Sequence, residues 1–209
     1  PLGRQQIIVE LKEGTNNMTI KNPVATAIDS SYIQYKRMGD ALKEASSMWA
    51  KVTHSEEKPI TYSICEWGMA RPYLWGAKAG SMWRTTPDIA PNWRSITMIY
   101  NRTLKLYKHS GPGHWNDPDM LEIGNGKLDD NENRAHFSLW CMLAAPLMLG
   151  NDIRSFVSNG MPDKDNETLK IVTNKHMIAV DQDSLGKSAK RIKKESGLSL
   201  IHISEPTRL

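Results

Sequence analysis

From Tyr32 onward, helix-like and strand-like segments alternate along the chain, and this alternation restricts the fold more than any other feature. Residues 31–51 carry apolar side chains at helical spacing, and an apolar, strand-like run follows at Ile60–Cys65. The same pair recurs as a strand at Ser81–Arg84 and a helix at residues 93–109. Repeated β/α units of this kind build parallel sheets that are covered by helices.

Two further units are expected. A short strand around His114–Asn116 leads to a helix at residues 130–145. Leu147–Leu149 should begin a fourth unit, which a helix around 167–174 and a strand at Met177–Val180 continue. A complete barrel of eight β/α units takes about 250 residues, and only about half of its strands are recognisable here. We therefore predict an α/β chain that forms part of a (β/α)8, or TIM, barrel.

Polar residues follow the apolar runs directly. Glu66 comes after the first run, Arg84 and Asp88 after the second, and Asp117-Pro118-Asp119 after the third. In a parallel barrel these positions meet at the carboxyl ends of the strands, where active sites are assembled. Carboxylates beside Trp, Arg and Gly/Pro turns suit the cleavage of a glycosidic bond, which needs paired carboxyl groups and donors that hold the sugar.

Composition excludes several classes of protein. The chain has 209 residues, of which 39% are hydrophobic and 24% charged, as in an ordinary globular protein. Its longest apolar stretch, residues 139–150, is interrupted by Pro146 and is too short to cross a bilayer, so no membrane partner is predicted. The net charge of +4 comes largely from residues 187–194, where no aromatic side chain is available for base stacking. We expect a solvated segment there and no nucleic-acid partner.

Cysteine and histidine positions do not indicate a cofactor. Cys65 and Cys141 are the only cysteines, and neither has the spacing of a metal or redox motif. Both are expected to be buried thiols. His136 shares a helix with apolar residues, so we expect it to pack in the core rather than to act as an acid or base. No metal and no cofactor are predicted.

The sequence divides into four stretches. Residues 1–27 read as an unassigned loop, 28–186 as the carboxyl-side part of the barrel, and 187–197 as a basic segment leading to a missing β domain. Residues 198–209 read as the translation of a sequencing adapter. Sequons at three asparagines favour a secreted, lysosomal or vacuolar glycoprotein, although no signal peptide is visible: Asn17, Asn101 and Asn166.

Four motifs, in order, resemble the α-galactosidases of glycoside hydrolase family 27: Tyr62–Gly68, Trp83–Ile89, Gly111–Glu122 and Ala144–Met148. The resemblance continues to Gly186 and covers roughly three quarters of the chain. It implies a retaining exo-glycosidase with a barrel and a following antiparallel β domain. The implied substrates are terminal α-galactosides of oligosaccharides, glycolipids or galactomannans. The oligomeric state stays open.

The resemblance also implies roles for individual residues. Asp88 matches the general acid/base, and Arg84 matches the arginine that binds the galactose hydroxyls. Asp119 matches a sugar-binding carboxylate, and Met120 should line the pocket beside it. Asp117 is expected to shape the turn through its backbone.

The loop that senses the 2-position of the sugar is implied at Cys65, Glu66 and Trp67. Which of these side chains points inward stays open, because a strand alternates its faces. The loop looks more like that of the galactose-specific members than that of the two related activities, α-N-acetylgalactosaminidase and β-L-arabinopyranosidase.

One part of the family pattern is absent. No segment of the Lys-Tyr-Asp-Asn-Cys type, which carries the nucleophile, precedes residues 31–51, and Asp29 has the surroundings of a loop or helix cap. The paired aspartates that hold the 4- and 6-hydroxyls are also missing. Since retaining cleavage needs two carboxyl groups about 5 Å apart, we expect this chain alone to be inactive. A galactose binder that uses Arg84, Asp119 and Trp67 without cleavage is the alternative from another class.

Overall fold

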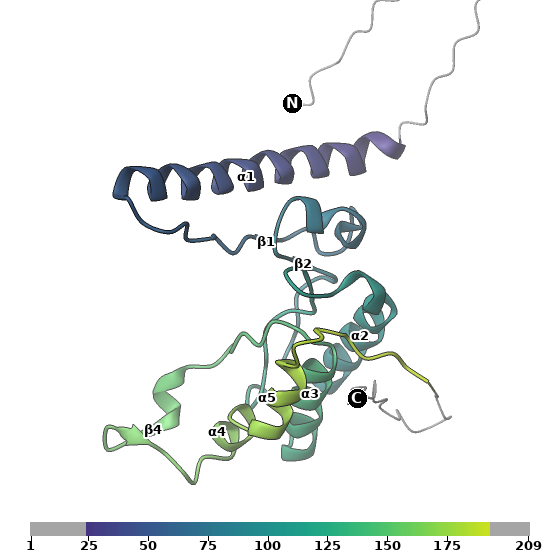
Figure 1. The fold of residues 1–209 in the computed structure, drawn as a ribbon. Coiled ribbons are helices and arrows are strands. Elements are labelled where there is room, and N and C mark those ends of the chain that lie inside the picture. Colours follow the sequence, from purple (N-terminus) through teal and green to yellow (C-terminus); the bar gives the residue numbers. More distant parts are fainter. Residues whose placement is uncertain (1–23, 193–209) are drawn as a thin grey trace, which may run out of the picture.

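The computed structural model describes residues 24–192, in which five α-helices accompany a small parallel sheet (Figure 1). The helices are α1 (Val24–Thr53), α2 (Trp93–Thr103), α3 (Asp130–Met142), α4 (Glu167–Val172) and α5 (Lys175–Asp181). The strands are β1 (Ser63–Ile64), β2 (Met82–Arg84), β3 (Trp115–Asp117), β4 (Val157–Ser158) and β5 (Met161–Pro162). Four short 3-10 helices lie between them: η1 (Pro72–Leu74), η2 (Gly76–Lys78), η3 (Leu104–His109) and η4 (Ile153–Phe156). The adapter-like residues 198–209 and the sequon at Asn17 lie outside the described residues.

The sheet has the strand order β1-β2-β3, and both pairs are parallel. Trp83 pairs with Ile64 on one side and with Asn116 on the other, so the three strands end at the same level. Arg84, the last residue of β2, pairs with Asp117, the last of β3. The predicted parallel arrangement of the first three β/α units is confirmed, and it places the residues that follow the strands along one edge.

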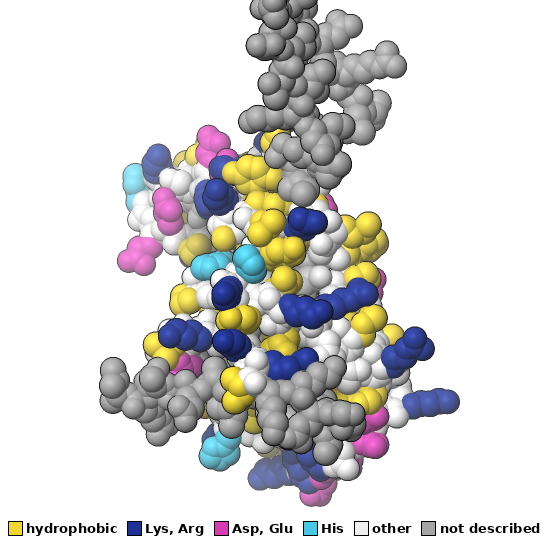
Figure 2. All heavy atoms as spheres, turned by 90° about the vertical axis from the view of Figure 1, so that its right-hand side faces the viewer, with side chains coloured by type: hydrophobic (Ala, Val, Ile, Leu, Met, Phe, Trp, Pro, Cys, Tyr) yellow, Lys and Arg dark blue, Asp and Glu magenta, His cyan; other side chains and the backbone are white. Residues whose placement is uncertain are grey.

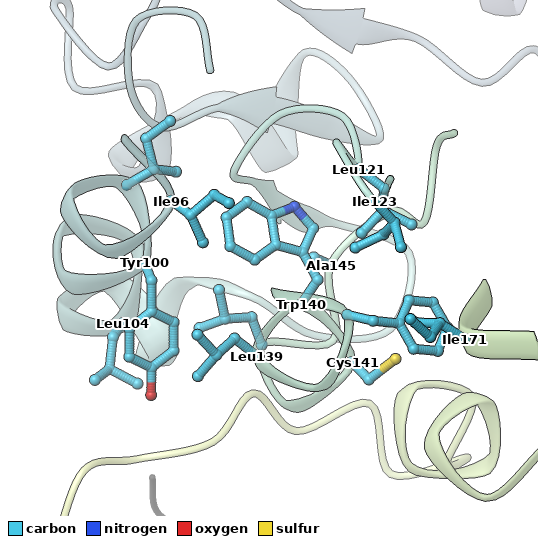
Figure 3. Packing of buried hydrophobic residues seen from close by; sticks show 13 residues of the cluster. Ile96, Tyr100, Leu104, Leu121, Ile123, Leu139, Trp140, Cys141, Ala145 and Ile171 are labelled. Carbon is cyan, nitrogen blue, oxygen red and sulfur yellow. The ribbon is translucent and has the colours of Figure 1, made fainter. Parts of the chain in front are cut away.

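The larger hydrophobic core packs against the segment that follows β3, which contributes Leu121 and Ile123. α2 and α3 contribute most of its side chains, and the stretch after β3 and the helix α4 close it (Figure 3). Burial of each such aliphatic side chain stabilises the fold by roughly 1.5–3 kcal/mol. Its fully or nearly fully buried members include Ile96, Ile99, Tyr100, Leu121, Ile123, Phe137, Leu139, Trp140, Leu143 and Ile171.

A second, smaller cluster connects α1 to the sheet. Ile64, Trp75 and Trp83 are buried there, and Tyr32 and Tyr35 of α1 pack against them. α1 approaches closely at Gly39, where an added Cβ would lie 1.9 Å from the carbonyl oxygen of Ala79. Figure 1 shows α1 on one side of β1 and β2, with α2 to α5 on the other. The three-stranded sheet therefore lies between the smaller cluster on the α1 side and the larger core formed by α2 to α4.

Several predicted boundaries are wrong. α1 begins at Val24, so the end of the expected loop 1–27 is helical, as is Asp29. Met38 and Met48, two of the apolar side chains at helical spacing in residues 31–51, are exposed. The helix expected at 93–109 ends at Thr103 and continues as η3, and the one expected at 130–145 ends at Met142.

Both strands expected late in the chain are also wrong. The residues Met177–Val180 lie inside α5, because Asn174 caps that helix by accepting hydrogen bonds from the N–H groups of His176 and Met177. Leu147–Leu149 is reduced to one parallel bridge between Leu149 and Leu121. The pattern of such short apolar runs fits a strand or a helix equally well. For residues 177–180, the helix cap at Asn174 is the feature that favours a helix.

Surface features agree in part with the composition. Within the described part of the chain, no helix combines the length and the apolar character that crossing a bilayer requires. Lys187 and Lys190 are exposed, as expected for the basic segment, but Arg191 lies 5.9 Å above the ring of Tyr100 and donates to Asn101. Figure 2 shows one face of the molecule, where lysines and arginines are spread among exposed hydrophobic side chains.

Two buried titratable groups respond to acid in opposite directions. Burial raises the pKa of the Asp181 carboxyl from 3.8 to about 6. Burial lowers the pKa of the His136 imidazole from 6.5 to about 4. Between pH 4 and 6, the folded state therefore binds more protons than the unfolded chain at Asp181 and fewer at His136.

Asp181→Asn should stabilise the protein at neutral pH by about 2 kcal/mol, with the gain disappearing near pH 4. The reason is that the wild-type carboxyl is ionised and desolvated above pH 6, whereas below its unfolded pKa it is neutral in both states. Urea unfolding at pH 4, 5, 6 and 7 measures the difference. Asp183→Asn, at an exposed neighbouring position, is the control and should leave stability unchanged at every pH. A gain that stayed constant with pH would contradict the assignment.

Candidate active site

Residues from three loops meet at the carboxyl edge of the sheet. Cys65 follows β1, Arg84 ends β2, and Asp119 comes two residues after β3. Because the strands are parallel and in register, these positions lie on the same edge. The structure brings Arg84, Asp88 and Asp119 into direct contact.

Arg84 is the centre of the contact. Its Nη2 lies 2.6 Å from Oδ2 of Asp119 and 3.0 Å from Oδ1 of Asp88, and it also donates to the carbonyl of Thr86. The Nε of the same guanidinium is buried without a hydrogen-bond partner within the described structure. Arg84 thus joins two carboxylates through one nitrogen of its guanidinium.

The two carboxylates have very different surroundings. The Asp119 side chain is 9% exposed, whereas the Asp88 side chain is 72% exposed. Oδ2 of Asp119 accepts the backbone N–H of Ile89 at 2.7 Å, and Oδ1 accepts that of Met120 at 2.8 Å. Asp119 is therefore fixed by donors on both oxygens, while the Asp88 carboxylate, among the described residues, is held through Arg84 alone and faces solvent.

Asp117 shapes the turn with its side chain, so the expectation that it acts through its backbone is incomplete. Its Oδ1 accepts a hydrogen bond of 2.8 Å from the N–H of Asp119, two residues later in the chain, which forms an Asx turn. The Asp117 carbonyl also accepts from the N–H of Thr85, which ties this turn to the end of β2. Burial raises the pKa of the Asp117 carboxyl, and the Asp119 N–H and the Arg84 guanidinium partly offset the effect.

The Cys65–Trp67 loop stands beside this contact. Cys65 is exposed, so its expected burial is wrong, whereas Cys141 is buried as expected. The phenol of Tyr35 donates to the carbonyl of Cys65 at 3.0 Å, which anchors the loop to α1. Burial raises the pKa of the Tyr35 hydroxyl, and the adjacent Glu66 carboxyl raises it further.

A second attachment fixes the other end of the loop. Trp67 has φ +50° and a half-exposed indole. At Gly68, an added Cβ would lie 2.2 Å from the carbonyl oxygen of Thr85, so only glycine permits this approach to the end of β2. The structure therefore places the predicted Cys65–Trp67 loop next to the Arg84 strand.

Met120 is also exposed at this edge, next to Asp119. A hollow of about 550 Å³ lies at the opposite, amino-terminal ends of the strands, lined by Thr61, Ser81, Met82, Trp115 and residues 181–184 among others. None of the predicted site residues lines that hollow.

Two buried groups at this edge were missed in the sequence. Trp140 of α3 donates its indole N–H to the carbonyl of Asp119 at 2.8 Å. Thr86 is buried, and its hydroxyl has no partner within the described structure. Trp140 lies 21 residues after Asp119, and its apolar surroundings in the sequence predict only a core residue. Thr86 stands inside the recognised motif, so its position was a usable signal.

His136 packs in the core, as expected. It is fully buried, its Nε2 accepts the N–H of Glu122 at 3.0 Å, and its ring meets Trp140 edge-on. Within residues 24–192, no three His, Cys, Asp or Glu side chains gather in a way that could hold a metal ion.

Comparison with known proteins gives consistent matches to this sequence and structure. The family described as alpha galactosidase A matches residues 25–183. An α-galactosidase of Oryza sativa subsp. japonica is 38% identical over 172 residues, which are 81% of this chain and 39% of the rice protein. An α-galactosidase of Cyamopsis tetragonoloba is 40% identical over 172 residues, 81% of this chain and 40% of its own length.

Solved structures agree. α-Galactosidase I from Mortierella vinacea is similar with a TM-score of 0.66 and 31% identity, covering 80% of this chain and 43% of that protein. The Saccharomyces cerevisiae α-galactosidase with raffinose matches with a TM-score of 0.60 and 31% identity, covering 78% and 37%. All four of these proteins are α-galactosidases by name.

The chain belongs to the alpha galactosidase A family. It spans about two fifths of the length of the curated relatives compared above.

Arg84→Met should lower the free energy of unfolding by about 3 kcal/mol, because it leaves the buried Asp119 carboxylate without its cation. Urea denaturation of the 209-residue chain measures the loss. Arg134→Met is the matched control, since it removes an arginine from an exposed pair with Glu167 and should cost far less. Equal losses in the two variants would show that the Arg84 contact is no stronger than a surface ion pair.

Proposed function

We propose that this chain supplies one wall of the active site of a retaining exo-α-galactosidase, as the carboxyl-side part of a TIM barrel. The observation that carries the proposal is the contact of one guanidinium with both Asp88 and Asp119 at the carboxyl edge of three parallel strands. Family membership supports it, since the relatives are α-galactosidases and one solved relative was determined with raffinose. In this proposal the substrate is a terminal α-galactoside of an oligosaccharide, glycolipid or galactomannan.

Asp88 is the proposed general acid and base. Its carboxyl group is exposed and has Arg84 as its hydrogen-bond partner, so it can reach a glycosidic oxygen or a water molecule. In the first step it donates its proton to the departing oxygen. In the second it accepts a proton from the water that attacks the glycosyl–enzyme intermediate.

Asp119 and Arg84 are the proposed binding groups. Asp119 and Asp88 contact the same Nη2 atom of Arg84, so their carboxyl groups are close together. Distance alone would therefore allow them to be the nucleophile and the acid/base of a retaining enzyme, whose carboxyl groups are about 5 Å apart. However, both oxygens of Asp119 already accept hydrogen bonds, one of them also pairing with Arg84. These donors fix the orientation of the Asp119 carboxylate. Among the described residues, Oδ1 accepts from the Met120 N–H alone, so it keeps a lone pair that can accept a sugar hydroxyl.

We propose that the nucleophile is supplied by sequence beyond this chain, so that residues 1–209 alone do not hydrolyse galactosides. The loop Cys65–Trp67 is the proposed contact for the 2-position of the sugar, with the half-exposed Trp67 indole as an apolar surface. Met120 is proposed to flank the ring beside Asp119. We also propose a secreted, lysosomal or vacuolar location.

In the full-length protein, Asp88→Asn should reduce kcat/KM for raffinose by at least about a hundred-fold, because the leaving alkoxide must be protonated. The loss should be much smaller for an aryl α-galactoside whose phenolate leaves without a proton. Steady-state kinetics on both substrates measures the contrast. Asp152→Asn, which also alters an aspartate paired with an arginine, is the control and should retain activity on both. Wild-type turnover of raffinose by Asp88→Asn would contradict the acid/base role.

A direct comparison tests the proposed function itself. The 209-residue chain and the full-length protein are expressed side by side and assayed on a chromogenic α-galactoside. We expect cleavage only by the full-length protein. A full-length protein that binds galactose without cleaving any α-galactoside would overturn the proposal in favour of a galactose-binding protein. Cleavage of the N-acetylgalactosaminide or the β-L-arabinopyranoside in preference to the galactoside would overturn the substrate assignment.

A further inference from the structure

We propose that Trp140 is a positioning residue for Asp119: its indole N–H fixes the Asp119 backbone so that the carboxylate meets Arg84. The inference rests on the proposed function only for the statement that Asp119 binds sugar. The contact itself is a property of the fold. Trp140 touches no reacting group and acts through the carbonyl of Asp119.

Asp119 needs an external constraint because its backbone is strained. Its φ is +84°, in a backbone region that residues other than glycine rarely adopt. Such conformations persist only where surrounding contacts overdetermine them. Without those contacts, the residue would relax toward negative φ, and its side chain would leave Arg84.

Both peptide groups of Asp119 are held from opposite sides. Its N–H donates to the carboxylate of Asp117, a neighbour in the chain. Its carbonyl accepts a hydrogen bond from the indole N–H of Trp140. Within the described structure, this is the one hydrogen bond that joins the Asp119 main chain to a residue far away in the sequence. The side chain then reaches the N–H of Ile89 and the guanidinium of Arg84. The turn alone fixes one side of Asp119, and Trp140 fixes the other.

Trp140 can serve this purpose because it is itself immobile. Its side chain is completely buried in the larger core, and Figure 3 shows its ring lying among the labelled residues of that cluster, with Ile96 on one side and Leu121 on the other. His136, one turn earlier on α3, meets it edge-on with ring centroids 4.1 Å apart. The same histidine accepts the N–H of Glu122. α3 therefore holds both ends of the segment 119–122.

The competing interpretation is that Trp140 is only a core side chain whose N–H happens to be satisfied. The two interpretations differ in what the loss of that N–H does at a distance. If Trp140 positions Asp119, the N–H of Ile89, which donates to the Asp119 carboxylate, loses its acceptor as well. If Trp140 only fills space, removal of its N–H leaves Ile89 unaffected.

The test compares Trp140→Phe with Trp75→Phe in the 209-residue chain. Trp75 is the matched control, because it is also a buried indole that donates to a backbone carbonyl, that of Ala70, at 2.9 Å. Amide hydrogen exchange followed by NMR reports on Ile89 and, as an internal standard, on Ile99 in α2. We expect the Ile89 amide to exchange about ten-fold faster in Trp140→Phe and at the wild-type rate in Trp75→Phe.

In the full-length protein, the same substitution should raise KM for an α-galactoside about ten-fold while kcat falls less, because binding rather than proton transfer is disturbed. Unchanged Ile89 exchange in a folded Trp140→Phe protein would overturn the positioning role. If Trp140→Phe unfolds, as loss of Ile99 protection would reveal, benzothienylalanine at position 140 keeps the ring shape and removes only the N–H. The same two exchange outcomes then decide. Failure of the proposed function would appear separately, as a wild-type protein without galactosidase activity.

Discussion

The ion pair between Arg84 and Asp119 depends on two hydrophobic cores at once. Trp83, the residue before Arg84, is buried in the smaller cluster with α1, whereas the Asp119 carbonyl is held by Trp140 in the larger cluster. The pair can form only if β2 and β3 keep the register that sets Arg84 opposite Asp117. The geometry of the carboxyl edge is thus a consequence of how these two cores are joined through the sheet.

This dependence explains the placement of several otherwise unrelated contacts. Thr85 donates its N–H to Asp117, and its carbonyl lies against Gly68 of the Cys65–Trp67 loop. Its hydroxyl hydrogen-bonds to that of Thr103 at the end of α2. A single residue beside Arg84 thereby connects all three loops of the edge to a helix of the larger core. Disturbance at any of these contacts would be transmitted to the guanidinium.

The sequence was sufficient for the parts of the fold that repeat. The β/α rhythm predicted the parallel strands, and the motif Trp83–Ile89 placed Arg84 and Asp88 correctly at the end of a strand. Local patterns failed where tertiary contacts decide. The prediction that Cys65 is buried failed, since its thiol is exposed whereas the neighbouring Ile64 is completely buried. Successive side chains of a strand face opposite sides, so an error of one residue in the register reverses such a prediction. The contact between Trp140 and Asp119 has no sequence signal, since an indole in a core helix has the same pattern with or without a distant acceptor.

The positive φ of Asp119 has a consequence for how such a protein changes over generations. Replacement of the strained aspartate by glycine would relieve the backbone, but it would also remove the buried partner of Arg84 and the acceptor of the Ile89 and Met120 N–H groups. Aspartate at this position therefore combines a local backbone cost with side-chain contacts that offset it. In a collection of randomly mutated variants, tolerance of glycine at position 119 under a folding screen but not under a sugar-dependent growth screen would be the genetic signature of that balance.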